Sequence, residues 1–391
     1  MLTCQKSLFQ LPDEVSYLNC AYLSPQLRSL EAIGIQALAR KNLPFTIQPK
    51  DFFEPIEQLK QFFAKLIHTP ENERIAIIPS ASYGIATVAK NVHLQAGDNI
   101  VVVEDQFPSN IYSWQRLAQE SNAILKVIPA PNSAQRSTNW NEAILDAIDE
   151  RTRLVALANV HWADGTWFDL MAIRKKTREV GALLVIDGTQ SVGALPIDVA
   201  ILQPDALICA GYKWLLGPYS IGLAYYGPAF DEGVPIEENW INRLNSEDFK
   251  SLVNYQSLYQ PGAGRYSVGE QSNFMLVPML SAALQQILDW GIESIQHYTK
   301  ELSAKPLEKL QALGCKVEPA EHRCGHLFGI RLDPSQFDFQ KLSEAFAVQK
   351  VYVSFRGSAI RVAPHVYNDE LDFDKLIACF QEARISKSIA V

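Results

Sequence analysis

Two short apolar runs in the middle of the chain are each followed by a residue that can do chemistry. Residues 183–187 end on an acid, Asp187, and an amide, Gln190, comes soon after it. Residues 207–210 lead into a turn that carries Lys213. Uninterrupted apolar runs of this length are typical of buried parallel strands, and open α/β sheets bind ligands at the carboxyl ends of such strands. We therefore expect Asp187 and Lys213 to face one pocket.

An acid and a lysine in one pocket suit pyridoxal 5'-phosphate (PLP). A lysine amine forms a Schiff base with the aldehyde of this cofactor. A carboxylate pairs with the protonated pyridine nitrogen and keeps the ring an electron sink. Each residue alone has an ordinary interpretation, because a strand-end Asp is often a turn or capping residue and a loop Lys is usually solvated. The pair, rather than either member, favours a PLP site.

The surrounding residues resemble the class V aminotransferase family of fold-type I PLP-dependent enzymes. The resemblance rests on Asp187-Gly-Thr-Gln190, on Tyr212-Lys213 and on the Gly217-Pro218 that follows. The family includes cysteine desulfurases, kynureninase, isopenicillin N epimerase and cysteine/cystine C–S lyases. It implies an α/β fold with a large domain, built on a mostly parallel seven-stranded sheet, and a smaller α+β C-terminal domain.

These elements can be placed along the chain by their apolar spacing. We expect an N-terminal arm at 1–27, a large PLP-binding domain at 28–275 and a small domain at 276–391, as the chain length also suggests. Residues 230–277 carry little regular pattern. The expected strands are 74–79, 99–103, 124–128, 153–158, 183–187, an antiparallel 221–226, 326–332, 351–355 and 359–363. The expected helices are 28–41, 51–67, 83–92, one carrying Trp114, 140–149, 169–180, 278–290, 291–313, 338–347 and one from 369.

The stretch Ser80-Ala81-Ser82 lies between an expected strand and an expected helix. Small residues there let backbone N–H groups and a hydroxyl approach a phosphate at the helix N-terminus. The resemblance makes this stretch the phosphate cradle, although a plain Ser N-cap would give the same pattern. It also places the Phe107 ring on the pyridine face, where a core Phe is the alternative.

The resemblance assigns the remaining cofactor contacts. His161 aligns with the family residue that reaches the phenolic oxygen, and a surface His is the alternative. Gly269 belongs to a segment that reaches the phosphate of the neighbouring subunit, but Glu270 stands where the family has Thr, and a carboxylate repels a phosphate. The full set of implied cofactor-binding residues is Ala81, Ser82, Phe107, His161, Asp187, Gln190, Tyr212, Lys213 and Gly269.

For the substrate, the resemblance selects Arg361, the second arginine of Arg356-Gly-Ser-Ala-Ile-Arg361. A planar guanidinium binds both oxygens of an α-carboxylate. Asn19, in Tyr17-Leu-Asn19, resembles a family segment at the mouth of the site; an arm packed on the small domain is the alternative. Trp240, in the irregular stretch, completes the expected substrate contacts.

The family chemistry implies that Lys213 holds the cofactor as an internal aldimine and then acts as general base on a small α-amino acid. Aminotransferase is the leading expectation, and a cysteine/cystine C–S lyase or another β-eliminating enzyme is the alternative. A persulfide-forming desulfurase is disfavoured, because its loop cysteine is missing between Arg356 and Arg361. A non-catalytic binding protein on the same fold is the third possibility, disfavoured because both Lys213 and Asp187 are present.

The composition limits the classes of protein and the cellular compartments that fit this sequence. The net charge of −8 gives no sign of a basic surface that would bind nucleic acid. The six scattered cysteines include no CxxC pair, which argues against a metal site and suits a reducing compartment. No apolar run approaches the length of a membrane span, and the first residues lack a signal-peptide pattern. We therefore expect a cytoplasmic enzyme, and the resemblance adds a homodimer with shared active sites.

Overall fold

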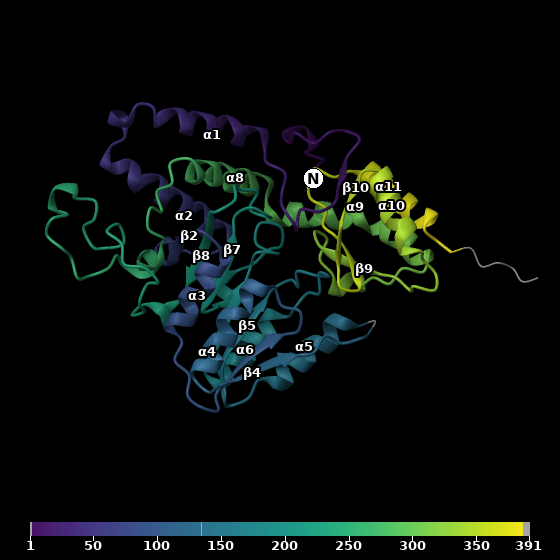
Figure 1. Cartoon of the computed structure of the whole chain (residues 1–391), viewed down its shortest axis with the longest axis horizontal. Helices are drawn as coiled ribbons and strands as arrows, with labels where there is room; N and C mark the ends of the chain where they lie inside the picture. The colour runs from purple at the N-terminus through teal and green to yellow at the C-terminus, as the bar shows by residue number, and fades with distance from the viewer. Residues whose placement is uncertain (1, 134, 386–391) are drawn as a thin grey trace, which may run out of the picture.

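A seven-stranded sheet forms the centre of the computed structural model, which describes residues 2–133 and 135–385 (Figure 1). The outermost residues of the expected arm and small domain, 1 and 386–391, lie outside this description. β8 runs antiparallel to both of its neighbours, and all other pairs are parallel. In sheet order the strands are β2 (Ile75–Ile78), β8 (Gly222–Tyr226), β7 (Ala206–Ala210), β6 (Leu183–Asp187), β5 (Thr152–Ala158), β3 (Asn99–Val103) and β4 (Ile124–Ile128). The expected α/β class and mostly parallel seven-stranded sheet are confirmed.

Helices cover both faces of this sheet, which explains why its inner strands read as continuous apolar runs. Side chains of α3 and α4 pack on one face, and those of α2, α5, α6 and α8 pack on the other. α1 lies against α8 at the edge of the molecule (Figure 1). The helices of this part are α1 (Arg28–Arg40), α2 (Glu54–Leu66), α3 (Ala81–Asn91), α4 (Tyr112–Glu120), α5 (Arg136–Ala147), α6 (Leu170–Val180), α7 (Val199–Leu202) and α8 (Leu276–Trp290).

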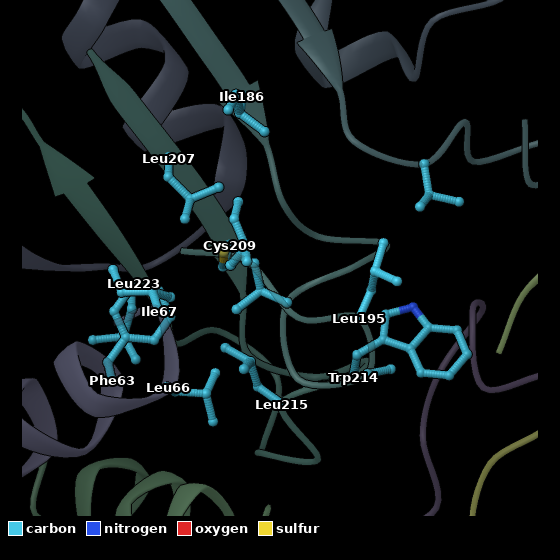
Figure 2. Close-up of a cluster of buried hydrophobic side chains, with 14 of the residues drawn as sticks. Phe63, Leu66, Ile67, Ile186, Leu195, Leu207, Cys209, Trp214, Leu215 and Leu223 are labelled. Atoms are coloured by element: carbon cyan, nitrogen blue, oxygen red, sulfur yellow. The ribbon is translucent and has the colours of Figure 1, made fainter. Parts of the chain in front are cut away.

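The core beneath the site is formed where β7 and β8 meet α2. Figure 2 shows Leu207 and Cys209 of β7 and Leu223 of β8 on the same side as Phe63 and Leu66 of α2. All five side chains are buried. This contact holds β7 in place, and the carboxyl end of β7 leads to Lys213.

The C-terminal part has its own small sheet and core. The sheet is antiparallel, in the order β11 (Ser354–Arg356), β12 (Ala359–Val362), β9 (Phe328–Arg331). Its second apolar cluster includes Phe346, Phe373 and Phe380. The helices that supply it are α9 (Ile292–Ala312), α10 (Phe339–Val348) and α11 (Glu370–Glu382).

The N-terminal arm contacts both parts of the chain. β1 (Ser16–Tyr17) pairs in parallel with β10 (Val351–Tyr352). Farther along, the backbone N–H of Ser24 donates to the carbonyl of Tyr212, beside Lys213. The two interpretations of the arm are therefore compatible, because it packs on the small domain and also reaches the site.

Some elements differ from the sequence-based expectations. The strand expected at 351–355 is divided, because β10 pairs with the arm whereas β11 joins the small sheet. α5 begins at Arg136, earlier than expected, and the short α7 was not expected. The irregular stretch 230–277 contains only short 3-10 turns before α8. Pairing partners that lie far away in the chain decide these boundaries, and a local pattern does not contain them.

Two features are absent from the described residues. No helix there is both long and apolar enough to cross a membrane. No three His, Cys, Asp or Glu side chains there gather as a metal ion would require.

The core contact of Figure 2 gives a stability prediction. Leu207→Ala leaves a cavity between β7 and α2, and we expect it to cost about 2–5 kcal/mol of unfolding free energy, measured by urea denaturation. Val348→Ala, at a site that is 79% exposed, is the control and is expected to change stability by less than about 0.5 kcal/mol. Equal effects of the two substitutions would contradict this assignment of the core.

Candidate active site

A cavity of about 200 Å³ opens at the carboxyl ends of three neighbouring strands of the large sheet. Ala158, Asp187 and Ala210 are the last residues of β5, β6 and β7, and all three line it. The full lining is Pro79, Ser80, Ala81, Ser82, Gln106, Phe107, Ser109, Ala158, Trp162, Asp187, Thr189, Gln190, Ala210, Tyr212, Lys213, Tyr219, Ser220 and Ile221. The structure therefore brings seven of the sequence-predicted residues to one cavity: Ala81, Ser82, Phe107, Asp187, Gln190, Tyr212 and Lys213.

Lys213 lies in this cavity with its amine largely withdrawn from water. The side chain is 6% exposed, and its Nζ lies 5.3 Å from the centroid of the Phe107 ring. Burial lowers the pKa of Lys213 to about 8, and the nearby Asp187 carboxylate opposes that shift. A lysine with this pKa is partly unprotonated near neutral pH and can act as a nucleophile or a base.

Asp187 is a buried acid without a cation partner among the described residues. Its Oδ1 accepts a hydrogen bond from the backbone N–H of Thr189 at 3.0 Å. Burial raises the pKa of Asp187, and the Thr189 hydrogen bonds and Lys213 oppose that shift. A protonated pyridine nitrogen would supply the missing positive charge, so this acid fits the PLP ring.

The opposite end of the cavity is the N-terminus of α3. Ser80 caps the helix, since its Oγ accepts from the backbone N–H of Tyr83 at 3.2 Å. The hydroxyls of Ser80 and Ser82 lie 2.9 Å apart. The Ser cap is therefore present, and the small lining residues stand at a helix N-terminus, where the helix dipole favours an anion. The phosphate contact itself stays a prediction.

Gln190 and Tyr212 line the cavity but are also held by the scaffold. The Gln190 amide donates to the carbonyl of Ala21 at 3.1 Å and accepts from the Trp214 indole at 2.9 Å. The Tyr212 ring lies 4.5 Å from that of Tyr219, centroid to centroid. Gln190 therefore joins the arm to the Lys213 turn as well as facing the cavity.

His161 is not brought to this cavity. Its Nδ1 lies 3.3 Å from the Asp164 carboxylate, and its ring packs 5.2 Å from Trp140. The His161 N–H donates to the Thr166 carbonyl and the Gly165 N–H donates to the His161 carbonyl, which closes a tight turn that directs His161 inward. The next residue, Trp162, lines the cavity instead and contacts the Phe107 ring edge-on at 5.4 Å.

Arg361 and Asn19 lie beside the cavity rather than in its wall. One Arg361 Nη donates to the Trp162 carbonyl at 2.7 Å, and its buried Nε has no hydrogen-bond partner. Burial lowers the pKa of Arg361 to about 10. The Asn19 side chain accepts from the Ser354 hydroxyl at 2.9 Å, which packs the arm against the small sheet.

Gly269 and Trp240 lie elsewhere in the same chain. The Gly269 N–H donates to Glu237, whose carboxylate also accepts from the Tyr83 hydroxyl at 3.1 Å. Trp240 packs in an aromatic group with Phe52 and Phe249. Neither lines the cavity of its own chain, and their expected contacts stay predictions.

Several lining residues were not expected from the sequence: Gln106, Trp162, Thr189, Tyr219 and Ser220. Thr189 lies inside the Asp187–Gln190 motif, where its position next to Asp187 was a usable signal. Ser220 has a left-handed backbone, with φ 68°, directly after Tyr219. The sequence around Trp162 did not indicate that its side chain lines the cavity, because the direction of its turn depends on contacts with distant residues.

The buried amine gives a prediction on pH. In the cofactor-free protein, the rate at which Lys213 reacts with PLP should rise with pH and reach half its maximum near pH 8, whereas an ordinary lysine titrates near ~10.4. Asp187→Asn removes the charge that raises this pKa, so the midpoint should move to lower pH. Visible absorbance measures both rates. A midpoint near that of a solvent lysine would contradict the desolvation of this amine.

Known proteins resemble the chain along most of its length. The model of the class V aminotransferase family matches residues 48–366. An uncharacterised aminotransferase of Schizosaccharomyces pombe is 24% identical, over 98% of this chain and 95% of its own. A cysteine desulfurase of Enterobacter sp. is 27% identical, over 66% of this chain and 62% of its own.

Solved structures show the same fold. A C-DES mutant with glycine covalently linked to its PLP cofactor has a TM-score of 0.85 at 20% identity, over 97% of this chain and all of that one. With a buried lysine, an unpaired acid and a helix N-terminus at one cavity, this chain belongs to the class V aminotransferase family of PLP-dependent enzymes.

Proposed function

We propose that this enzyme transaminates a small α-amino acid. The observation that carries the proposal is the buried Lys213, which shares one cavity with Asp187 and Phe107 and has Arg361 beside it. The relative named as an aminotransferase matches nearly the whole chain, which is compatible with this assignment.

The residues present would divide the work as follows. Asp187 would hold the ring nitrogen of PLP, Phe107 would pack on the ring, and the α3 N-terminus would hold the phosphate. When bound, the cofactor supplies an electron sink for the negative charge left at Cα when its proton departs. The protein provides the position and the dry surroundings for that chemistry.

Lys213 is placed to move the Cα proton. Its amine, with a pKa of about 8, accepts a proton at neutral pH and can return it, as a general acid–base catalyst requires. Arg361 would hold the α-carboxylate through its planar fork, because its buried guanidinium has no carboxylate partner among the described residues. Together they would fix the Cα–H bond relative to the lysine.

A persulfide-forming desulfurase remains disfavoured. The hairpin between β11 and β12 carries Gly357 and Ser358 and no thiol. Cys20, whose charge state Lys213 and Arg361 influence, is fully buried, and burial raises its pKa to about 12. A thiol of this kind is a poor nucleophile, because the reactive form is the thiolate.

A β-eliminating enzyme, such as a cysteine/cystine C–S lyase, is the second candidate. It would use the same lysine, acid and arginine, and it requires no protein thiol. The missing hairpin cysteine is therefore compatible with it. The two candidates differ in what happens after the Cα proton has left, and their products separate them.

The test compares the wild-type enzyme with Lys213→Ala after PLP is added to both. The covalent cofactor band in the visible spectrum is expected only in the wild type, because no other amine replaces Lys213 in this cavity. Conversion of an amino acid to its keto acid, with the amino group retained on the cofactor, supports transamination. Release of pyruvate and sulfide from cysteine or cystine supports the lyase instead. A wild type without the band would refute the role of Lys213.

We further propose a homodimer in the cytoplasm, with active sites completed across the interface. Exposed apolar side chains support the dimer: Ile35 and Leu38 are 62% and 64% exposed on α1, and Phe45 is 81% exposed just after it. α1 lies at the edge of the molecule, where a second chain can reach it (Figure 1). The six cysteines are all free, which supports a reducing compartment.

Charging this α1 surface should separate the subunits. The wild type is expected to have the mass of two chains by light scattering, and the double variant Ile35→Asp, Leu38→Asp is expected to shift toward one chain. The control is Leu371→Asp on α11, which is 69% exposed and lies away from α1. A wild type that stays monomeric at micromolar concentration would refute the dimer.

A further inference from the structure

Two arginines near Lys213 lack an acidic partner among the described residues. The guanidinium of Arg361 is buried and its Nε makes no hydrogen bond. Arg356 also has a buried Nε without a partner, and its only hydrogen bond to the protein is to the neighbouring Phe355 carbonyl at 2.9 Å. A buried charge without a partner is costly, so Arg361 suits an anion that arrives with a ligand, and the half-buried Arg356 is free to bind a second one.

Arg356 lines a second cavity next to the first. This cavity has a volume of about 330 Å³, and Gln106 and Trp162 belong to the walls of both cavities. Arg136, Asp164 and Arg331 also line the second cavity, together with the hairpin residues 356–359. Trp162 and Gln106 therefore lie between the two cavities.

The other two arginines around this second cavity, Arg136 and Arg331, are already paired. The Asp164 carboxylate lies 2.9 Å from the Nε of Arg136, accepts from Arg331, and also accepts from the Thr166 hydroxyl at 2.8 Å. Glu318, also close to Arg331, is buried with the pKa of its carboxyl raised by desolvation. Asp105 is exposed. Arg356 is the cation that remains without an acidic partner.

Successive contacts lead from the catalytic lysine to this arginine. The Lys213 amine lies over the Phe107 ring, that ring meets the Trp162 ring edge-on, and the Arg356 guanidinium lies 5.6 Å from the centroid of the Trp162 ring. A substrate whose Cα lies near Lys213, with its carboxylate at Arg361, can extend its side chain past Trp162 toward Arg356.

We propose that the substrate is an α-amino acid whose side chain ends in a second anionic group, and that Arg356 holds this group in the second cavity. The proposal rests on the proposed function and narrows it to an acidic substrate class. Two guanidinium groups then meet two anions, the α-carboxylate at Arg361 and the side-chain carboxylate or phosphate at Arg356. Arg356 would thus be the residue that selects the substrate.

The competing role for Arg356 is to assist Arg361 with the α-carboxylate. The two roles differ in their consequences. If Arg356 binds the side chain, its loss should erase the difference between acidic and neutral substrates. If it helps with the α-carboxylate, its loss should weaken the binding of both substrate classes equally and leave their ratio unchanged.

The test titrates the PLP-loaded enzyme with matched pairs: glutamate against glutamine, aspartate against asparagine, and phosphoserine against serine. The dissociation constants come from the change in the visible spectrum. In the wild type we expect the acidic member of a pair to bind roughly tenfold to a hundredfold more tightly. The pair with the largest ratio tells a carboxylate substrate from a phosphate one. Arg356→Gln should bring this ratio close to one, and Arg356→Lys should restore part of it.

A second readout uses ligands that cannot react. Calorimetry with succinate and butyrate measures the same preference without turnover, and Arg356→Gln should remove it there too. Arg116→Gln is the matched control, because this arginine is 80% exposed on α4 and should leave every ratio unchanged.

The outcomes separate the two proposals. Equal wild-type affinities within each pair would overturn the acidic substrate class, and a ratio that survives Arg356→Gln would overturn the role of Arg356. In both cases a normal cofactor band and turnover of amino acids would still support the proposed function. A wild type without the covalent band, or without a spectral response to any amino acid, would instead overturn the proposed function itself, and the substrate class with it.

Discussion

The removal of one amine from water is the constraint on which the site depends. Lys213 becomes reactive because the protein buries it, and burial is possible only where the backbone leaves a dry space between strand ends. β6 and β7 create that space. Their register pairs Asp187 with Ile208, and the N–H of Gly188 donates to the Ile208 carbonyl at 2.8 Å. The acid and the lysine turn are thus fixed by the same pair of strands.

Glycine is required where the segments approach most closely. A Cβ at Gly188 would lie 2.8 Å from the Cys209 Sγ, and one at Gly211 would lie 2.5 Å from the Ile221 carbonyl oxygen. At Gly211 the obstructing atom belongs to the backbone, so any other residue would require a backbone shift, whereas at Gly188 the surrounding buried side chains would have to move. The packing in Figure 2, with Leu207 and Cys209 against α2, holds these strands from below. The core and the site therefore depend on each other, because a shift of β7 would also move Lys213.

The charges at the site are unbalanced in a way that suits anionic ligands. Among the groups discussed, Asp187 is the acid that faces the Lys213 cavity, whereas Lys213, Arg356 and Arg361 all lie in or beside it. Coulomb interactions are strong where water is excluded. A phosphate, an α-carboxylate and the proposed side-chain anion would each meet a positive group or a helix N-terminus. Ligand binding would then lower the electrostatic free-energy cost of keeping these charged groups away from water.

Features that depend on residues close together in the chain could be predicted from the sequence. The strands at 183–187 and 206–210, the acid and lysine that follow them, and Phe107 could be found from apolar runs and motifs, because each lies in a strand or directly after one. His161 and Trp162 could not be told apart in this way. Which of them faces the cavity depends on Asp164, and Asp164 is held by Arg331 from the small sheet, far along the chain. The division of β10 from β11 has the same origin.

The small domain completes the site through polar contacts with the large one. Arg361 of β12 binds the Trp162 carbonyl, and the His326 ring lies 2.8 Å from the Gln190 carbonyl. The lysine and the acid thus come from one sheet, whereas the two arginines proposed to bind the substrate come from the other. If the proposed roles hold, a small rotation between the two sheets would leave the cofactor contacts intact and move both guanidinium groups together.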